Sequence, residues 1–161
     1  MPQVKNKIAL NIILIFSIFV LITAYFIEYF LDHKPCNLCL IERVPYISAI
    51  IIISLSLILK KFEKLALILL SLIFFFATII SFYHFSIEQG FVTESLVCNL
   101  DSSITNLSKE DLIKELQQQT VGCKDVSFRI FGLSLATINT IISLILSVIT
   151  IKLFLNYGKN E

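Results

Sequence analysis

Two cysteines in a short segment are the residues best suited to chemistry in this chain. Residues 35–43 read Pro-Cys-Asn-Leu-Cys-Leu-Ile-Glu-Arg, which places Cys36 and Cys39 in a C-x-x-C spacing. The thiolate is the form that attacks disulfides, and a helix N-terminus or a nearby cation stabilises it. Arg43 follows Cys39 by four residues and would share its face on a helix. The spacing predicts an exchanging dithiol with a cation beside it.

Three other uses of this cysteine pair were considered. A c-type haem site needs histidine directly after the second cysteine, where this chain has Leu40. A zinc site usually combines two close-spaced motifs, whereas 24 residues lie between Cys98 and Cys123. Unreactive buried thiols are also common in apolar proteins. A zinc site and unreactive thiols therefore stay open beside the exchanging dithiol.

The later cysteines, Cys98 and Cys123, lie in the longest polar segment of the chain. A disulfide between them could be a staple that stabilises the fold by roughly 3 kcal/mol through loop closure. It could also pass two electrons to Cys36 and Cys39 through a mixed disulfide. The presence of two cysteine pairs makes such a relay plausible.

Several polar and aromatic residues near the cysteines have two interpretations. Arg43 is either an interfacial anchor or the group that holds a carbonyl oxygen of a quinone. His84, at the outer end of the third apolar run, is either a solvated cap or part of the site. Tyr46 is expected to pack in the protein interior. Glu88 and Gln89 are expected on the loop surface.

The composition predicts the elements that must position these residues. The chain has 161 residues, of which 57% are hydrophobic and 16% charged, whereas a soluble domain is about a quarter charged. We expect one all-α membrane domain over residues 1–161, a bundle of four transmembrane helices. The first run is longer than the core of a cleaved signal peptide. The net charge of +1 argues against nucleic acid as a partner. The expected helices are residues 8–27, 40–59, 65–83 and 131–155.

The positions of the lysines predict the orientation. The termini and the 60–64 turn carry seven lysines against two acids, while loops 28–39 and 84–130 together with Glu42 and Arg43 carry six cations against ten acids. The positive-inside rule places both termini in the cytoplasm. All four cysteines then lie on the outer side, where disulfides persist. The longer outer loop is expected to carry a short amphipathic helix at Ser108–Gln119, lying on the membrane or packed on protein.

Taken together, three separated segments resemble a known family. Residues 34–46, Lys-Pro-Cys-Asn-Leu-Cys-Leu-Ile-Glu-Arg-Val-Pro-Tyr, look like the signature of the disulfide bond formation protein B (DsbB) family of bacterial inner membranes. Residues 83–90, Cys98 and residues 122–135 also resemble stretches of that family, in the same order. The resemblance covers nearly the whole chain.

The resemblance implies an oxidase of the periplasmic thiol oxidant DsbA, with ubiquinone or menaquinone as electron acceptor. By that similarity, reduced DsbA attacks Cys98, whose disulfide partner is Cys123. Electrons then pass to the pair Cys36 and Cys39. In the related vitamin K epoxide reductase type, the C-x-x-C follows the loop pair, so the cysteine order here speaks against that type.

The resemblance also implies roles around the quinone. Cys39 would lie nearest to it, Arg43 would support the quinone or the thiolate, and His84 matches a family position nearby. A further hypothesis is that a helix break at Pro45 leaves room for the quinone ring beside Cys39 and Arg43. The rival interpretation is a non-catalytic membrane protein whose cysteines form structural disulfides or a zinc site.

Overall fold

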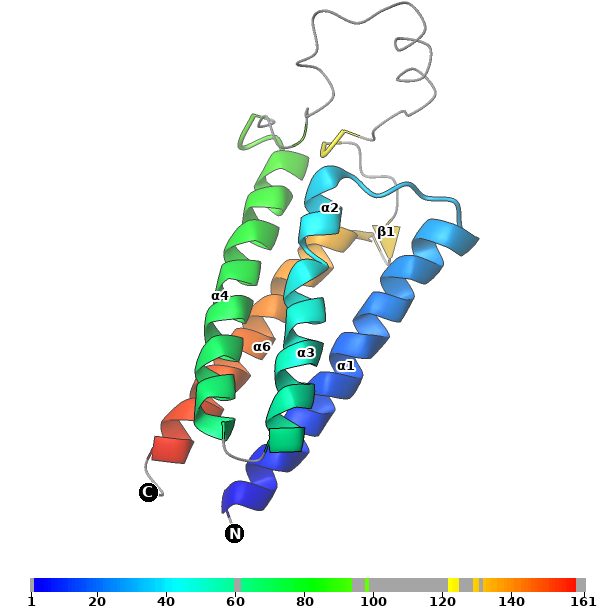
Figure 1. Ribbon diagram of the computed structural model, residues 1–161. Coiled ribbons are helices and arrows are strands. Elements are labelled where there is room, and N and C mark those ends of the chain that lie inside the picture. The colour runs from blue at the N-terminus through cyan, green and yellow to red at the C-terminus, as the bar shows by residue number, and fades with distance from the viewer. Residues whose placement is uncertain are drawn as a thin grey trace, which may run out of the picture.

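Four long helices lie side by side in this computed structural model (Figure 1). The structure describes residues 2–59, 62–93, 98, 122–124, 129–130 and 132–158. Its elements are α1 (Pro2–Phe30), α2 (Asn37–Ile41), α3 (Val44–Leu59), α4 (Glu63–Glu88), β1 (Arg129–Ile130), β2 (Leu133–Ser134) and α6 (Leu135–Gly158). The predicted loop helix Ser108–Gln119 lies outside these residues.

Four helical segments of the described chain are long and apolar enough to cross a membrane. They are Lys7–Phe30, Asn37–Leu59, Glu63–Glu88 and Leu135–Tyr157, and the second of them joins α2 and α3. A helix satisfies its own backbone hydrogen bonds, which is why apolar runs of this length cross lipid as helices. The predicted class, an all-α membrane protein with a four-helix bundle, is confirmed.

Small polar and apolar residues line the contacts between the helices. Large apolar side chains on the outward faces, such as Phe19, Phe75 and Leu144, are exposed, as expected for helices surrounded by lipid. Helices in membranes associate where small side chains let their backbones approach closely. The buried small residues on the long helices of the described chain include Ser17, Ala49, Ser56, Ala66, Ala77, Ser81, Ser86, Ala136, Ser143, Ser147 and Thr150.

A fully buried phenylalanine in this packing offers a test of the bundle. Phe74 is fully buried in the core and meets the Tyr46 ring edge-on, with centroids 6.1 Å apart. Replacing it by alanine leaves a cavity, so we expect Phe74→Ala to destabilise the folded protein by about 3 kcal/mol. Unfolding in mixed detergent micelles would measure the loss. Phe75→Ala, at an exposed neighbour, is the matched control, and an equal loss there would contradict the packing.

The second span contains a break, and a proline explains where it falls. In a continuous helix the Pro45 ring would collide with the carbonyl of Ile41, and proline has no N–H to donate. α2 therefore ends at Ile41 and α3 begins at Val44, which places Pro45 in the first turn, where proline is tolerated. We predicted a kinked or broken turn at Pro45 itself. The break instead comes just before it, at Glu42 and Arg43.

Two expected helix ends are corrected by the structure. α4 was expected to end at Tyr83 but continues to Glu88, so His84 lies within the helix. The last helix was expected from residue 131 but begins at Leu135, because β1 and β2 pair antiparallel just before it. Gly132 between these strands has φ +82°, a conformation that favours glycine.

The remaining helix bounds differ by a few residues. α1 extends at both ends beyond the expected 8–27, and the second span begins at Asn37 rather than residue 40. Figure 1 shows the start of α1 and the end of α6 at one end of the bundle, with α2 and the end of α4 at the opposite end. The cysteine motif therefore lies at the end away from both termini.

Candidate functional site

Cys36 is the first residue of the site, and it caps α2. Its backbone is extended (φ −73°, ψ 167°), and its Sγ accepts a hydrogen bond from the backbone N–H of Cys39 at 3.2 Å. Both thiols are free, with Cys36 buried and Cys39 half-buried. The cysteine pair therefore lies at the N-terminus of a helix.

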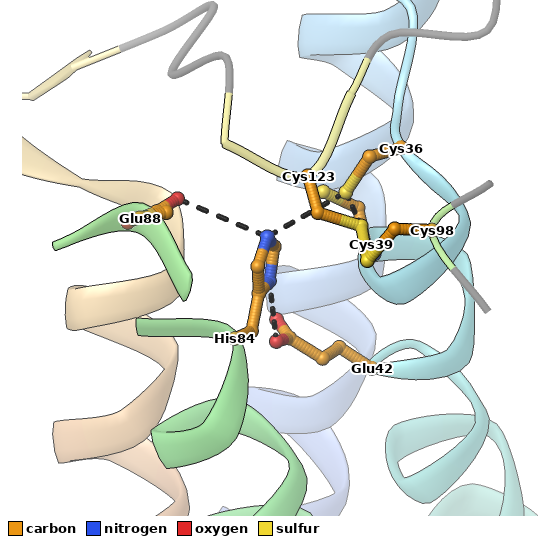
Figure 2. The surroundings of a disulfide bond; sticks show 7 residues. All are labelled: Cys36, Cys39, Glu42, His84, Glu88, Cys98 and Cys123. Carbon is orange, nitrogen blue, oxygen red and sulfur yellow. Dashed lines mark hydrogen bonds and ion pairs between the residues drawn. A yellow bond between two sulfur atoms is a disulfide. The ribbon is translucent and has the colours of Figure 1, made fainter. Parts of the chain in front are cut away.

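Cys98 and Cys123 form a disulfide that packs against the first cysteine pair. Both are buried, and they share an apolar cluster with Cys36, Leu38 and Ile87. Figure 2 shows the disulfide directly beside the free thiols. The sequence left the pairing open between a staple and a relay. The structure brings the two pairs together in one cluster, so their sulfur atoms could meet without a large movement of the chain.

His84 links the free thiols to two carboxylates. Its Nε2 lies 3.6 Å from Cys36 Sγ and 3.9 Å from Glu88 Oε1, and its Nδ1 lies 2.8 Å from Glu42 Oε1 (Figure 2). The ring is buried, so the interpretation of His84 as a solvated cap was wrong. The cause is the extra helical turn of α4, which keeps this residue inside the bundle.

Glu88 is also corrected by the structure. We expected it on the loop surface, but its side chain is only 6% exposed. Its carboxylate accepts a hydrogen bond from the hydroxyl of Ser134, the last residue of β2, directly before α6. The contact ties the end of α4 to β2, and it places a second acid next to His84.

Sequence reasoning missed two residues that hold the site together. Glu42 Oε2 accepts a hydrogen bond of 2.8 Å from Asn139 Nδ2, which also donates to Ser81 Oγ at 2.8 Å. Asn139 Oδ1 in turn accepts a bond of 2.6 Å from the Tyr46 hydroxyl. Tyr46 packs inside, as expected. A charged residue within an apolar span usually marks function, and that signal could have identified Glu42.

The surroundings of Cys36 favour its thiolate form. The thiol of Cys39 lowers the pKa of Cys36 most, as a hydrogen-bond donor, and His84 lowers it further through hydrogen bonding and charge. Burial raises the pKa but is outweighed, so the pKa falls to about 5. These surroundings therefore favour the thiolate of Cys36, which is the nucleophile in disulfide exchange.

Arg43 is held against α1. Its guanidinium pairs with the carboxylate of Glu28 and lies over the Tyr25 ring, 4.9 Å from the ring centroid. The spacing predicted that Arg43 shares one helical face with Cys39. Because α2 ends at Ile41, before Arg43, the two residues do not lie on one regular helix. Both residues nevertheless line the same cavity.

The cavity beside these residues has a volume of about 310 Å³. Its polar end contains the free cysteines, Arg43 and His84, and its apolar walls come from α1 and α6. The expected room beside Cys39 and Arg43 is therefore present. The apolar lining includes Phe16, Phe19, Val20, Ile27, Ile138 and Ile142.

The same side chains offer a possible metal site. Among the described residues, the ligand atoms of Cys36, Cys39 and His84 all lie within 4.8 Å of one another. Two sulfurs and one nitrogen are donors that zinc accepts. The zinc interpretation therefore stays open on geometric grounds.

Comparisons with known proteins agree with the resemblance seen in the sequence. The family model described as disulfide bond formation protein DsbB matches residues 6–153. The chain is also 34% identical over 155 residues to the uncharacterized protein RP370 of Rickettsia prowazekii (strain Madrid E), and the match covers 94% of this chain and 90% of that protein. The region matched by the family contains all four cysteines.

Proposed function

This chain belongs to the DsbB family, and from that premise we propose that it reoxidises a periplasmic DsbA-like dithiol and passes the electrons to a quinone. Membership implies an oxidoreductase role in disulfide bond formation, and the four apolar helices make the chain a multi-pass membrane protein. One observation carries the proposal. A closed Cys98–Cys123 disulfide packs against two free thiols that line an amphipathic cavity.

In the proposed relay, electrons move by two successive thiol–disulfide exchanges. A thiolate of the partner attacks Cys98, and Cys123 leaves as a thiolate. The partner's second thiol releases Cys98, and the reduced loop pair then opens the Cys36–Cys39 disulfide and closes again. Each exchange conserves one disulfide and moves two electrons. A closed loop pair beside an open inner pair is the state expected after the second exchange.

The residues present fit the quinone that the family generally uses. When bound, a quinone would accept two electrons and two protons from the inner dithiol. Its carbonyl oxygens are acceptors only, and the Arg43 guanidinium supplies N–H donors at the polar end of the cavity. The apolar walls suit a ring and an isoprenoid tail, and the volume is that of a small-molecule site. We propose ubiquinone or menaquinone as the acceptor. His84 would lie at the same end of the cavity, in contact with Cys36.

We propose that the protein lies in the bacterial inner membrane with both termini in the cytoplasm. The lysine-rich ends support this orientation. The four cysteines would then face the periplasm, where a DsbA-like partner is found. After reduction, a membrane-impermeant maleimide should label Cys36 and Cys39 in intact cells. Labelling that occurred only after lysis would contradict the orientation.

A thiol count in membranes tests the proposed function. After reduction and removal of the reductant, excess quinone should oxidise the cysteines and lower the number of free thiols by four per chain. Lipid extraction of the purified protein, read by absorbance, should also yield a quinone. Thiols that persist with every quinone tested would overturn the proposal.

Arg43 is the residue that tests the cavity as a quinone site. A hydrogen bond to a charged group contributes about 1.5–3 kcal/mol, so we expect Arg43→His to raise the KM for quinone by about tenfold or more. Thiol–disulfide exchange at the cysteines should continue. Arg129→His changes the other arginine, which is exposed in β1, and serves as the matched control. An unchanged KM would return Arg43 to the anchor interpretation.

A metal site is the second candidate function, and the spacing of Cys36, Cys39 and His84 favours it. Metal analysis of protein purified under reducing conditions distinguishes the two. One zinc per chain, together with thiols that resist quinone, would favour the metal site.

A further inference from the structure

We propose that Glu42 is a positioning residue, which holds a proton on Nδ1 of His84 so that Nε2 exchanges a proton with Cys36. Asn139 holds the Glu42 carboxylate for this task. The purpose of such a relay rests on the proposed function, because an active thiolate matters for disulfide exchange. Its geometry rests on hydrogen bonds among described residues.

The orientation of Asn139 determines what Glu42 can accept. The amide oxygen accepts the Tyr46 hydroxyl proton, so the amide nitrogen points to Ser81 and to Glu42 Oε2. An amide nitrogen only donates, so Oε2 must accept. The other oxygen, Oε1, lies 2.8 Å from Nδ1 of His84. A carboxylate with one donor on each oxygen satisfies every bond, and it requires a proton on Nδ1.

This arrangement leaves Nε2 of His84 to serve the thiol. Nε2 lies 3.6 Å from Cys36 Sγ, within reach of a bond to sulfur. The Cys36 S–H proton moves to Nε2, which gives a thiolate and an imidazolium and moves no electrons. The same proton returns when Sγ is protonated again, while the Nδ1 proton stays on Glu42's side of the ring. An acid that orients a histidine in this way raises the basicity of its other nitrogen.

The lowered pKa of Cys36 agrees with this geometry. The Cys39 thiol is the largest cause, and His84 adds to it against burial. Glu42 is bonded to His84, and His84 in turn contacts Cys36, so Glu42 should control that second part of the shift. The other titratable or charged groups around the cavity are Cys39 from α2, Tyr46 from α3, Glu88 from α4, Arg43 from the helix break, Glu28 from α1, and His33 and Lys34 before Cys36.

The first experiment measures alkylation of Cys36 against pH in the purified, reduced full-length protein. Iodoacetamide traps the thiolate, and peptide mass spectrometry reports Cys36 separately. In Glu42→Gln the His84 imidazolium loses the carboxylate that stabilises it, so the positive charge that favours the Cys36 thiolate is weakened. We expect the half-maximal pH to rise by about one unit, since a nearby opposite charge shifts a pKa by about 1–3 units. Glu42→Asp keeps the charge and should retain more of the low midpoint. Glu63→Gln, at a buried glutamate paired with Lys7 on α1, is the matched control and should change nothing.

The second experiment asks whether Glu42 acts through His84. In a His84→Gln background, Glu42→Gln should cause no further rise in the midpoint, because the coupled residue is gone. Asn139→Ala should raise the half-maximal pH of Cys36 alkylation in the wild-type background and leave it unchanged in the His84→Gln background. This variant provides a test even if the Glu42 variants fold poorly. An equal rise in both backgrounds, or no rise in the wild type, would overturn the proposal. No step needs quinone, so a failure of the proposed function would appear separately, as absent quinone reduction with an intact alkylation profile.

Discussion

Replacing Cys39 by serine should reduce quinone reduction by a DsbA-like dithiol to the background rate. A serine hydroxyl cannot form a disulfide, so Cys36 has no partner with which to close the inner pair. The electrons of the loop cysteines then have no route to the cavity. Quinone absorbance in membranes, with the reduced partner as donor, measures the loss. Turnover at the wild-type rate would exclude the proposed relay.

A small dithiol as donor separates this block from a block at the loop. Dithiothreitol can reduce the inner pair directly, so Cys98→Ser should still reduce quinone with dithiothreitol while it fails with the protein partner. Cys39→Ser should fail with both donors. If Cys98→Ser also fails with dithiothreitol, the loop pair has a role beyond delivering electrons. Loss of the Cys39 thiol also removes the main cause of the lowered Cys36 pKa, so Cys36 should then alkylate at higher pH.

The helical framework could be predicted because lipid leaves the backbone little choice. An apolar run of about 20 residues must form a helix to satisfy its own hydrogen bonds, and four such runs predict four spans. The ends of the helices were harder to predict. The polar residues after Tyr83 predict that the third helix ends there. His84 and Glu88 instead have hydrogen-bond partners inside the bundle, and α4 continues to Glu88.

Residue spacing predicted the candidate site only where it is local in sequence, and Cys98, Cys123 and His84 were assigned to it through the family resemblance. Cys36, Cys39 and Arg43 lie within eight consecutive residues, so their spacing alone indicated a dithiol beside a cation. The contact between Glu42 and Asn139 joins positions 97 residues apart. Helix packing creates that contact, and no local pattern in the sequence announces it.

Replacing Cys123 by alanine should trap a mixed disulfide between Cys98 and the partner protein. In this variant the Cys98 thiol attacks the oxidised partner, and one partner cysteine leaves as a thiolate. In the wild type, Cys123 forms a buried disulfide with Cys98 and is the second thiol that displaces the partner. The variant has no such thiol, so the mixed disulfide persists. Non-reducing gels should show a new band at the summed mass, which disappears on reduction.

The position of that link tests the order of the relay. Cys98→Ala with Cys123 replaced as well should form no such band, because the proposed attacking thiol is absent. Peptide mapping of the trapped complex identifies the linked cysteine. A link at Cys36 would reverse the order, since the inner pair would then receive electrons from the partner directly.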